Sequence, residues 1–191
     1  MIRAAIRSDI PALLAIETAS FQHERINRRS FTHLLTGANA VTLIDEKNRQ
    51  PCGYLTLLFR SNSSCSRVYS IATHPDFLRS GVAAKLLRVA EQIALARQCD
   101  TIRLEIRKDN LASFTFFQTH GYRKFSEYPS YYQDGMNAHR LQKSLTHLMR
   151  SMTSSTTGIL LLPLIRSPNQ YADRSYWRRK RAISTIQTRL K

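Results

Sequence analysis

The sequence is poor in cysteine, poor in acidic residues and free of long hydrophobic runs. Its cysteines are Cys52, Cys65 and Cys99, an odd number without C-x-x-C spacing and without clustered histidines. Such a pattern favours neither a disulfide framework nor a zinc site. We therefore predict no bound metal and a cytoplasmic location, where thiols stay reduced.

No segment has the length of a membrane span. The longest apolar run, GILLLPLI at residues 158–165, is far short of the roughly 20 residues that a span needs. The N-terminal stretch is interrupted by Arg7, Asp9 and Pro11 before a signal-length apolar core can form. We therefore expect neither a membrane span nor a targeting segment.

The scarcity of acidic residues leaves a net charge of +16, because 29 Lys and Arg stand against 13 Asp and Glu. Residues 1–146 hold 20 basic and 12 acidic residues, and residues 147–191 hold 9 and 1, so each part carries +8. A basic segment of this kind is typical either of contact with an anionic partner or of a solvated tail. We predict a folded domain over 1–146 and a basic, flexible extension over 147–191.

Hydrophobic periodicity predicts alternating strands and helices in the first part of the chain. Helices are expected after the capping residues Ser8 and Asp9, from Ser30 to near Gly37, and over 81–97 and 110–120, the last closed by Gly121. Strands are expected over residues 1–6, 40–45, 52–59, 66–73 and 100–108, followed by a final strand region in 122–128 and 138–145. This order predicts an α/β sheet with helices on both faces.

The stretch YSIATHPDFLRSGVAAKLL, residues 69–87, passes from a strand through a turn into a helix that a glycine opens. A helix N-terminus presents unpaired N–H groups and a positive dipole end, which together bind an anion such as pyrophosphate. Gly81 and Ala83 let a phosphate approach, and Arg79 adds a charge. The alternative is a glycine that only makes a tight turn.

Within this stretch, HPDFLRSGVA resembles the acetyl-coenzyme A loop of GCN5-related N-acetyltransferases (GNAT). That loop reads Arg or Gln, any two residues, Gly, any one residue, and then Gly or Ala. Gly81 and Ala83 match that loop, whereas Leu78 departs from its first position. The resemblance implies acetyl-CoA as cosubstrate. The residues it implies as cofactor contacts are Ile71, Ala72, Thr73, Arg79, Ser80, Gly81, Val82, Ala83, Asn110 and Phe117.

The segment LEIRKDNLASFTFFQTHGYRKFSEYPSYYQDG is similar to the end of the ribosomal-protein-alanine N-acetyltransferase branch of that family. The resemblance covers residues 2–146. It implies the GNAT fold, a mixed central β-sheet splayed between its fourth and fifth strands. It also implies a general base at Glu105, on the face of its strand opposite Ile102, Leu104 and Ile106. Spacing alone allows a surface carboxylate between Arg103 and Arg107.

Other roles follow from the same resemblance, each beside a plain structural alternative. Backbone N–H groups at Ile71 and Ala72 are expected to hold the thioester carbonyl. Asn110 contacts the cofactor or caps the helix that follows it. His120, next to the helix-ending glycine, is expected to be a capping residue.

The sequence departs from the branch at the position of the general acid. Where the branch has a tyrosine that protonates the leaving thiolate, this chain has Phe117, which carries no hydroxyl. Either Tyr131 or Tyr132 supplies the proton, or water does, or catalysis is impaired. For the acceptor amine we expect a site lined by Glu24, Glu127, Tyr128 and Tyr131. Tyr128 and Tyr131 are equally consistent with core or interface packing.

The C-terminal extension places Tyr171, Tyr176 and Trp177 beside the basic run 178–181. Basic and aromatic residues together are typical of RNA or ribosome contact, and they also occur in disordered tails. The resemblance to the ribosomal-protein-alanine branch, in turn, implies an N-acetyltransferase whose acceptor is a protein or peptide N-terminal amine. The alternatives are a small-molecule amine acetyltransferase and a non-catalytic module that binds acetyl-CoA or RNA.

Overall fold

One seven-stranded mixed sheet, in the order β1-β2-β3-β4-β5-β7-β6, dominates the computed structural model, which describes residues 1–22 and 24–146. The strands are β1 (Ile2–Ala4), β2 (Ala40–Lys47), β3 (Gln50–Leu58), β4 (Cys65–Thr73), β5 (Thr101–Arg107), β6 (Arg123–Tyr128) and β7 (Ala138–Ser144). The pair β4–β5 is parallel and the other neighbours are antiparallel. The predicted α/β class is confirmed.

The helices are α1 (Ile10–Ser20), α2 (Arg28–Thr36), α3 (Val82–Ala96) and α4 (Leu111–Thr119), with short 3-10 turns η1 (Arg7–Asp9) and η2 (Pro75–Phe77). One start differs from the prediction: α2 begins at Arg28, because the Asn27 side chain accepts a hydrogen bond from Ser30 N and caps the helix. Gly121, with a φ of +86°, follows the end of α4 as predicted.

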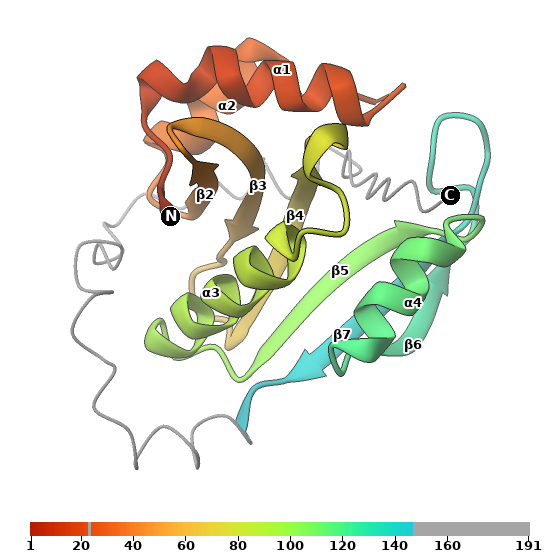
Figure 1. Cartoon of the computed structure of the whole chain (residues 1–191). Coiled ribbons are helices and arrows are strands. Elements are labelled where there is room, and N and C mark those ends of the chain that lie inside the picture. The colour runs from red at the N-terminus through yellow and green to blue at the C-terminus, as the bar shows by residue number, and fades with distance from the viewer. Residues whose placement is uncertain (23, 147–191) are drawn as a thin grey trace.

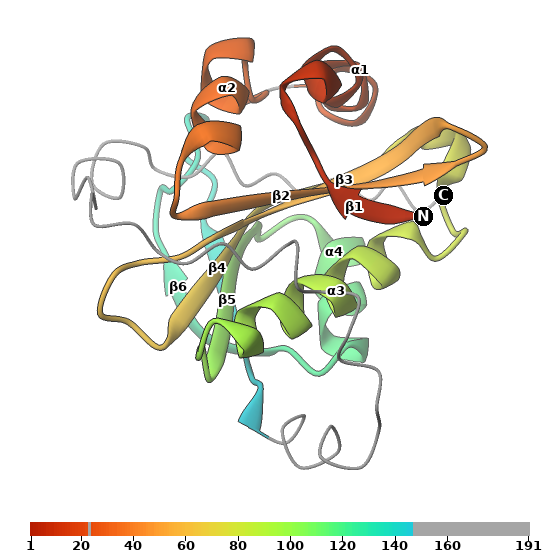
Figure 2. The same cartoon turned by 90° about the vertical axis from the view of Figure 1, so that its left-hand side faces the viewer.

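Helices cover both faces of the sheet, as Figure 2 shows: α1 and α2 lie on one face, and α3 and α4 on the other. Each face has its own apolar core. The core under α1 and α2 includes Leu13, Phe31 and Tyr54. The core under α3 and α4 includes Leu86, Ile102 and Phe117. The alternation of apolar residues along β5 sends Leu104 to the second core and leaves Glu105 on the side of the first.

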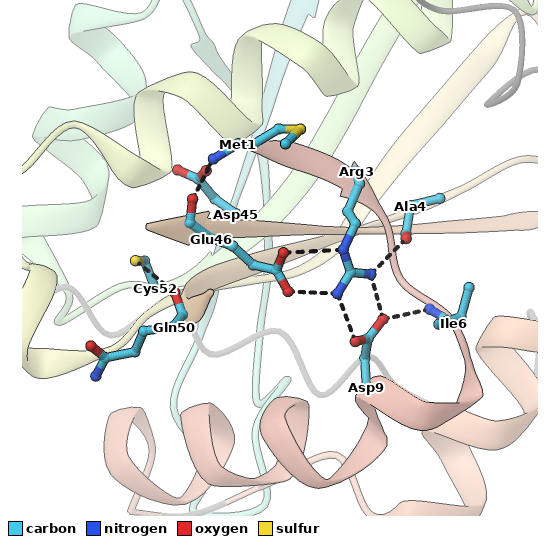
Figure 3. Close-up of polar contacts among 9 residues, drawn as sticks. All are labelled: Met1, Arg3, Ala4, Ile6, Asp9, Asp45, Glu46, Gln50 and Cys52. Atoms are coloured by element: carbon cyan, nitrogen blue, oxygen red, sulfur yellow. Dashed lines mark hydrogen bonds and ion pairs between the residues drawn. The ribbon is translucent and has the colours of Figure 1, made fainter. Parts of the chain in front are cut away.

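An arginine clamp ties the first strand to its surroundings (Figure 3). Arg3 Nη1 and Nη2 donate to the two Asp9 carboxylate oxygens at 2.7 and 2.8 Å, and its Nη2 and Nε donate to Glu46 at 2.5 and 3.2 Å. Asp9 therefore does not cap α1 with its side chain, contrary to expectation, because its carboxylate accepts from Arg3 and from Ile6 N. The clamp joins β1, β2 and the start of α1.

The last two strands form a hairpin in which β7 lies between β5 and β6. The sequence predicts strand character in both segments but not this order. Across residues 1–22 and 24–146, no helix is long and apolar enough to cross a membrane. The basic extension, with its predicted RNA or ribosome contact, lies outside the described residues.

Candidate active site

The sheet parts between β4 and β5, and Figure 1 shows the two strands diverging. Their parallel pairing covers only Cys65–Arg67 against Thr101–Arg103, after which β5 pairs with β7 alone. On its other edge β4 stays paired with β3 as far as Thr73. The register there skips Tyr69, since Thr56 pairs with Ser70 and Leu57 with Val68, so a β-bulge lies beside the opening. The predicted splay is thus confirmed.

The predicted carbonyl-holding residues lie on the β4 edge of this opening. Ile71, Ala72 and Thr73 are all buried, at 3%, 4% and 9% exposure. Beyond Arg67 this edge of β4 has no strand partner, and alternate residues of a strand direct their N–H and C=O groups to opposite edges. Part of the backbone in this segment is therefore available to a group that enters between the strands.

The loop from β4 into α3 has the backbone geometry of an anion site. Arg79 and Gly81 both have positive φ, +61° and +79°. The first hydrogen bond within α3 runs from Lys85 N to Gly81 O at 3.0 Å, so the amides of 82–84 belong to the first helical turn. Ser80 and Arg79 are exposed beside them. The segment thus brings Arg79, Ser80, Gly81, Val82 and Ala83 together at a helix N-terminus.

A second glycine, not singled out in the sequence, sets the position of this helix. A Cβ on Gly53 of β3 meets Ala72 O at 2.7 Å and Val82 Cγ1 at 2.7 Å. Any side chain there forces backbone or helix to move. By contrast, Gly81 has open space around its Cα, so its requirement is the left-handed φ. Gly53 is therefore required because α3 packs too close for a side chain, and Gly81 is required because its backbone is left-handed.

Glu105 lies on β5 just beyond the last residue that pairs with β4. It is 4% exposed, so the alternative of a surface carboxylate is wrong. Arg67 Nε donates to Glu105 Oε2 at 2.7 Å, and Arg140 Nε lies 3.6 Å from Glu105 Oε1. Each carboxylate oxygen is thus faced by an arginine, which keeps the buried charge compensated.

The two candidate proton donors have different surroundings. Tyr131 accepts a hydrogen bond at its hydroxyl from Arg67 Nη2, at 2.9 Å. Tyr132 is 4% exposed, and burial raises the pKa of its hydroxyl, with the Tyr131 and Glu24 charges adding to that rise. Its ring lies under the Arg107 guanidinium at 4.9 Å. The raised pKa makes Tyr132 a weaker proton donor than an ordinary tyrosine, whereas the Tyr131 hydroxyl lies against the Arg67 guanidinium.

Asn110 and Phe117, both predicted cofactor contacts, have clear structural roles. Asn110 Oδ1 accepts from Ser113 N at 3.0 Å and caps α4. Phe117 is fully buried and packs edge-on against Phe116 and Tyr122, at centroid distances of 5.1 and 5.3 Å. The two cofactor contacts remain predictions. His120 is the C-cap residue of α4, as expected.

The predicted acceptor residues do not all lie on one face. Tyr128 is 39% exposed and stacks on Tyr131, and Glu24 Oε1 accepts from Gln133 N at 3.1 Å, which joins the loop after α1 to the loop before β7. Glu127 pairs with His139, whose β5 partner is Ile106, so Glu127 belongs to the sheet face opposite Glu105.

Glu127 also has partners that occupy its carboxylate. Lys108 and Lys124 donate to it at 2.9 Å each, and these bonds, with Asn137, lower its pKa to about 2. Tyr131 and Tyr128 are connected to Glu105 through Arg67 and Arg140. Glu24 bonds to the loop that carries Tyr131, and Glu127 lies on the opposite face of the sheet.

Arg67, Arg140 and Glu17 are important residues that the sequence reasoning missed. Glu17 is 1% exposed on the buried face of α1, where it accepts hydrogen bonds from the Tyr54 hydroxyl and from Ile26 N. Burial raises its pKa to about 7. A carboxylate on the apolar stripe of α1, and an arginine inside the otherwise buried strand β4, are signals that the sequence carries.

The fold and this opening resemble those of solved N-acetyltransferases. The ribosomal-protein-S18-alanine N-acetyltransferase of Escherichia coli superposes with a TM-score of 0.69 at 20% identity, over 76% of this chain and 93% of that one. The PaiA N-acetyltransferase of Thermoplasma acidophilum, solved with coenzyme A, gives 0.64 at 13% identity, over 75% and 98%.

Sequence comparison gives the family. The model of the acetyltransferase (GNAT) family matches residues 10–122, so the chain belongs to that family, as its motifs predict. The chain is 25% identical over 149 residues to the catalytic subunit NAA10 of the N-terminal acetyltransferase A complex of Arabidopsis thaliana, which covers 75% of this chain and 77% of that protein. The protein is therefore an acetyl-CoA-dependent N-acetyltransferase that acts on amines.

Proposed function

We propose that this protein transfers the acetyl group of acetyl-CoA to the N-terminal amine of a protein or peptide. The observation that carries the proposal is Glu105, a buried carboxylate beside the point where β4 and β5 part. The names of two relatives support the acceptor class, since one is the catalytic subunit of an N-terminal acetyltransferase and the other acts on a ribosomal-protein alanine.

The residues present fit the cosubstrate. The left-handed backbone at Arg79 and Gly81 and the first-turn amides of α3 suit a pyrophosphate. The opening beside Ile71 and Ala72 suits an extended pantetheine arm, which hydrogen-bonds to free strand edges as a peptide does. Acetyl-CoA supplies an acetyl group that is activated as a thioester.

The side chains then divide the proton transfers between them. Glu105 accepts the proton that the acceptor nitrogen loses as its bond to the acetyl carbon forms. Backbone N–H groups near Ile71 and Ala72 polarise the carbonyl. The Tyr131 hydroxyl gives a proton to the sulfur as the C–S bond breaks, in place of the tyrosine that Phe117 replaces.

The proposal is tested by following thiol release from acetyl-CoA with three acceptors: a peptide with a free N-terminus, the same peptide with its N-terminus already blocked, and a polyamine. We expect turnover with the first alone, and mass spectrometry to place the acetyl group on the α-amine. Turnover with the polyamine alone would assign the protein to small-molecule amines. Binding of coenzyme A without turnover on any acceptor would make it a binding module.

Glu105→Gln supplies the mechanistic half of the test. We expect kcat to fall by about 10²- to 10⁴-fold, because the amide cannot take the proton, while the affinity for coenzyme A stays unchanged. Glu46→Gln is the matched control, since Glu46 pairs with Arg3 at the β1–β2 edge of the sheet. Equal kcat values in both variants would remove the general base from Glu105.

The remaining finer predictions stay proposals. Contact with RNA or a ribosome depends on the basic extension, outside the described residues. A cytoplasmic location is consistent with Cys52, Cys65 and Cys99, which are free cysteines.

A further inference from the structure

Arg67 lies at the point where the sheet opens. It is the last β4 residue that pairs with β5, opposite Arg103, so its side chain begins where the two strands part. That side chain is 17% exposed, and its guanidinium makes two connections. Nε donates to Glu105 Oε2 at 2.7 Å, and Nη2 donates to the Tyr131 hydroxyl oxygen at 2.9 Å while also contacting Glu105.

A second route joins the same two residues. Arg140, from β7, has its Nε 3.6 Å from Glu105 Oε1 and its guanidinium 4.3 Å above the Tyr128 ring. The Tyr128 ring in turn stacks on Tyr131, with centroids 5.6 Å apart and planes 7° from parallel. The side chains of Glu105, Arg67, Tyr131, Tyr128 and Arg140 therefore close a ring that spans β4, β5, β6, β7 and the loop between β6 and β7.

We infer that Arg67 is a positioning residue that couples the general base Glu105 to the proton donor Tyr131. The inference rests on the function proposed above. Arginine only donates, so the Tyr131 oxygen accepts from Arg67, and that bond does not use the phenolic proton. A guanidinium at hydrogen-bond distance also stabilises the phenolate, which helps Tyr131 to release its proton to the departing sulfur.

The coupling explains how the chain can work with Phe117 at the position where the related enzymes have a proton-donating tyrosine. Phe117 has no hydroxyl and lies in the core, so it cannot give a proton to the thiolate, and the scheme uses a tyrosine from another element instead. Arg67 orients a tyrosine from the β6–β7 loop toward the base, and it does so through a geometry that only a planar guanidinium offers. A lysine keeps the charge, but its donors lie on one nitrogen at the end of a flexible stem and lack the fixed planar fork that holds both partners in place.

The atoms balance in this scheme. The acceptor nitrogen gives its proton to Glu105 as the N–C bond forms, and the sulfur receives the Tyr131 proton as the C–S bond breaks. Glu105 releases its proton to solvent and the Tyr131 phenolate takes one up, so the site returns to its starting state. Arg67 keeps all its protons throughout.

Arg67→Lys tests the coupling in active protein. We expect kcat to fall about tenfold or more, with KM for acetyl-CoA changed less than about twofold, since the cofactor loop is untouched. Arg103→Gln is the matched control: Arg103 lies opposite Arg67 in the sheet, and it bonds to Gln142 and lies over Phe125. It is expected to retain kcat within about twofold.

A double-mutant cycle separates coupling from a merely structural role. Tyr131→Phe alone is expected to cost about 10²-fold in kcat, and Arg67→Lys is expected to cost markedly less in that background than in the wild type. Additive costs, or a Tyr131→Phe variant with wild-type kcat, would overturn the inference and leave the proposed acetyl transfer standing.

A titration judges the inference without any acceptor. The tyrosinate absorbance that Tyr131→Phe removes is expected to appear at higher pH in Arg67→Gln than in the wild type, because the cation no longer favours the phenolate. Circular dichroism checks that Arg67→Gln is folded, and Arg67→Asn or Arg67→Met, which also remove the cation, serve in turn where it is not. Titration at an unchanged pH in the folded variants would overturn the inference. Absence of wild-type turnover would count against the proposed function alone.

Discussion

The cofactor side of the site is built from backbone, whereas the acceptor side is built from side chains. Residues 71–83 form one continuous segment, whose positive φ angles and helix start make up the proposed anion site. On the other side, Arg67, Glu105, Tyr131 and Arg140 come from separate segments and meet only through the sheet order. The first side depends on local conformation and the second on long-range pairing.

This difference predicts where each side is fragile. The cofactor side tolerates changes of side chain but not of backbone space or φ. The acceptor side tolerates backbone adjustments but not the loss of a charge or hydroxyl, because its groups are buried and compensate one another.

The largest effect is expected at Gly53, which tests the role of backbone space. Gly53→Ala places a Cβ 2.7 Å from Ala72 O, so the end of β4 or the start of α3 must move. We expect a loss of about 3 kcal/mol in the free energy of unfolding. Calorimetry should show about tenfold or more weaker coenzyme A binding.

Gly37→Ala is the control for Gly53→Ala. Its Cβ lies 3.1 Å from His33 O at the end of α2, a smaller conflict in a backbone with a φ of −76°. Coenzyme A affinity is expected to stay at the wild-type value. Unchanged binding in Gly53→Ala as well would break the comparison, because the cofactor side would then not depend on the close approach of α3.

The cofactor side could be predicted from the sequence more fully than the acceptor side, because it depends on local conformation and the acceptor side depends on long-range pairing. Residues 69–87 contain the strand, the turn and the helix start in one stretch, so their joint role can be inferred locally. Arg67 stands out in the sequence as a charge in an apolar strand, but its partner cannot be inferred there. Tyr131 is brought near by a hairpin whose strand order periodicity does not define. Glu105 was identified through family resemblance, while its burial and its arginine partners required the structure.

Stability on the acceptor side should depend on pH through Glu17. Burial raises its pKa from 4.5 to about 7, so the unfolded state releases this proton first as pH rises. Stability from this group is full below pH 4.5 and falls as pH rises toward about 7. We expect the wild type to lose about 3 kcal/mol relative to Glu17→Gln across that window, as measured by urea unfolding.

Only the change with pH is diagnostic for Glu17. The amide offers a single acceptor to Tyr54 and Ile26 N, so Glu17→Gln also carries a constant cost that does not vary with pH. Parallel stability curves for the two proteins would show that Glu17 is ionised in the fold at neutral pH, and that this side of the sheet is better hydrated than its burial indicates.

The smallest effect is expected at Phe117, because the proposed proton donor is Tyr131, on the acceptor side. Phe117→Tyr adds a hydroxyl inside the core. The hydroxyl of the neighbouring Tyr122 already donates to Glu91 at 3.1 Å, so it is not a ready partner for the new one. We expect a loss of about 2 kcal/mol in stability, measured by thermal unfolding, and no gain in kcat.

Phe125→Tyr provides the stability control for Phe117→Tyr, because Phe125 is 37% exposed and its added hydroxyl reaches water. A higher kcat in Phe117→Tyr without loss of stability would show that α4 supplies the acid when it can. The general acid would then lie on the cofactor side and not on the acceptor side.

The sheet order also determines when each half of the site can form during synthesis. β6 contacts the rest of the sheet through β7, a strand that the ribosome makes later. The segment that holds the anion site is complete by the end of α3, and Glu105 follows shortly after. Tyr128 and Tyr131 reach Glu105 only once β7 has inserted beside β5, so in a nascent chain the proposed anion site can form before the proposed proton-transfer groups meet.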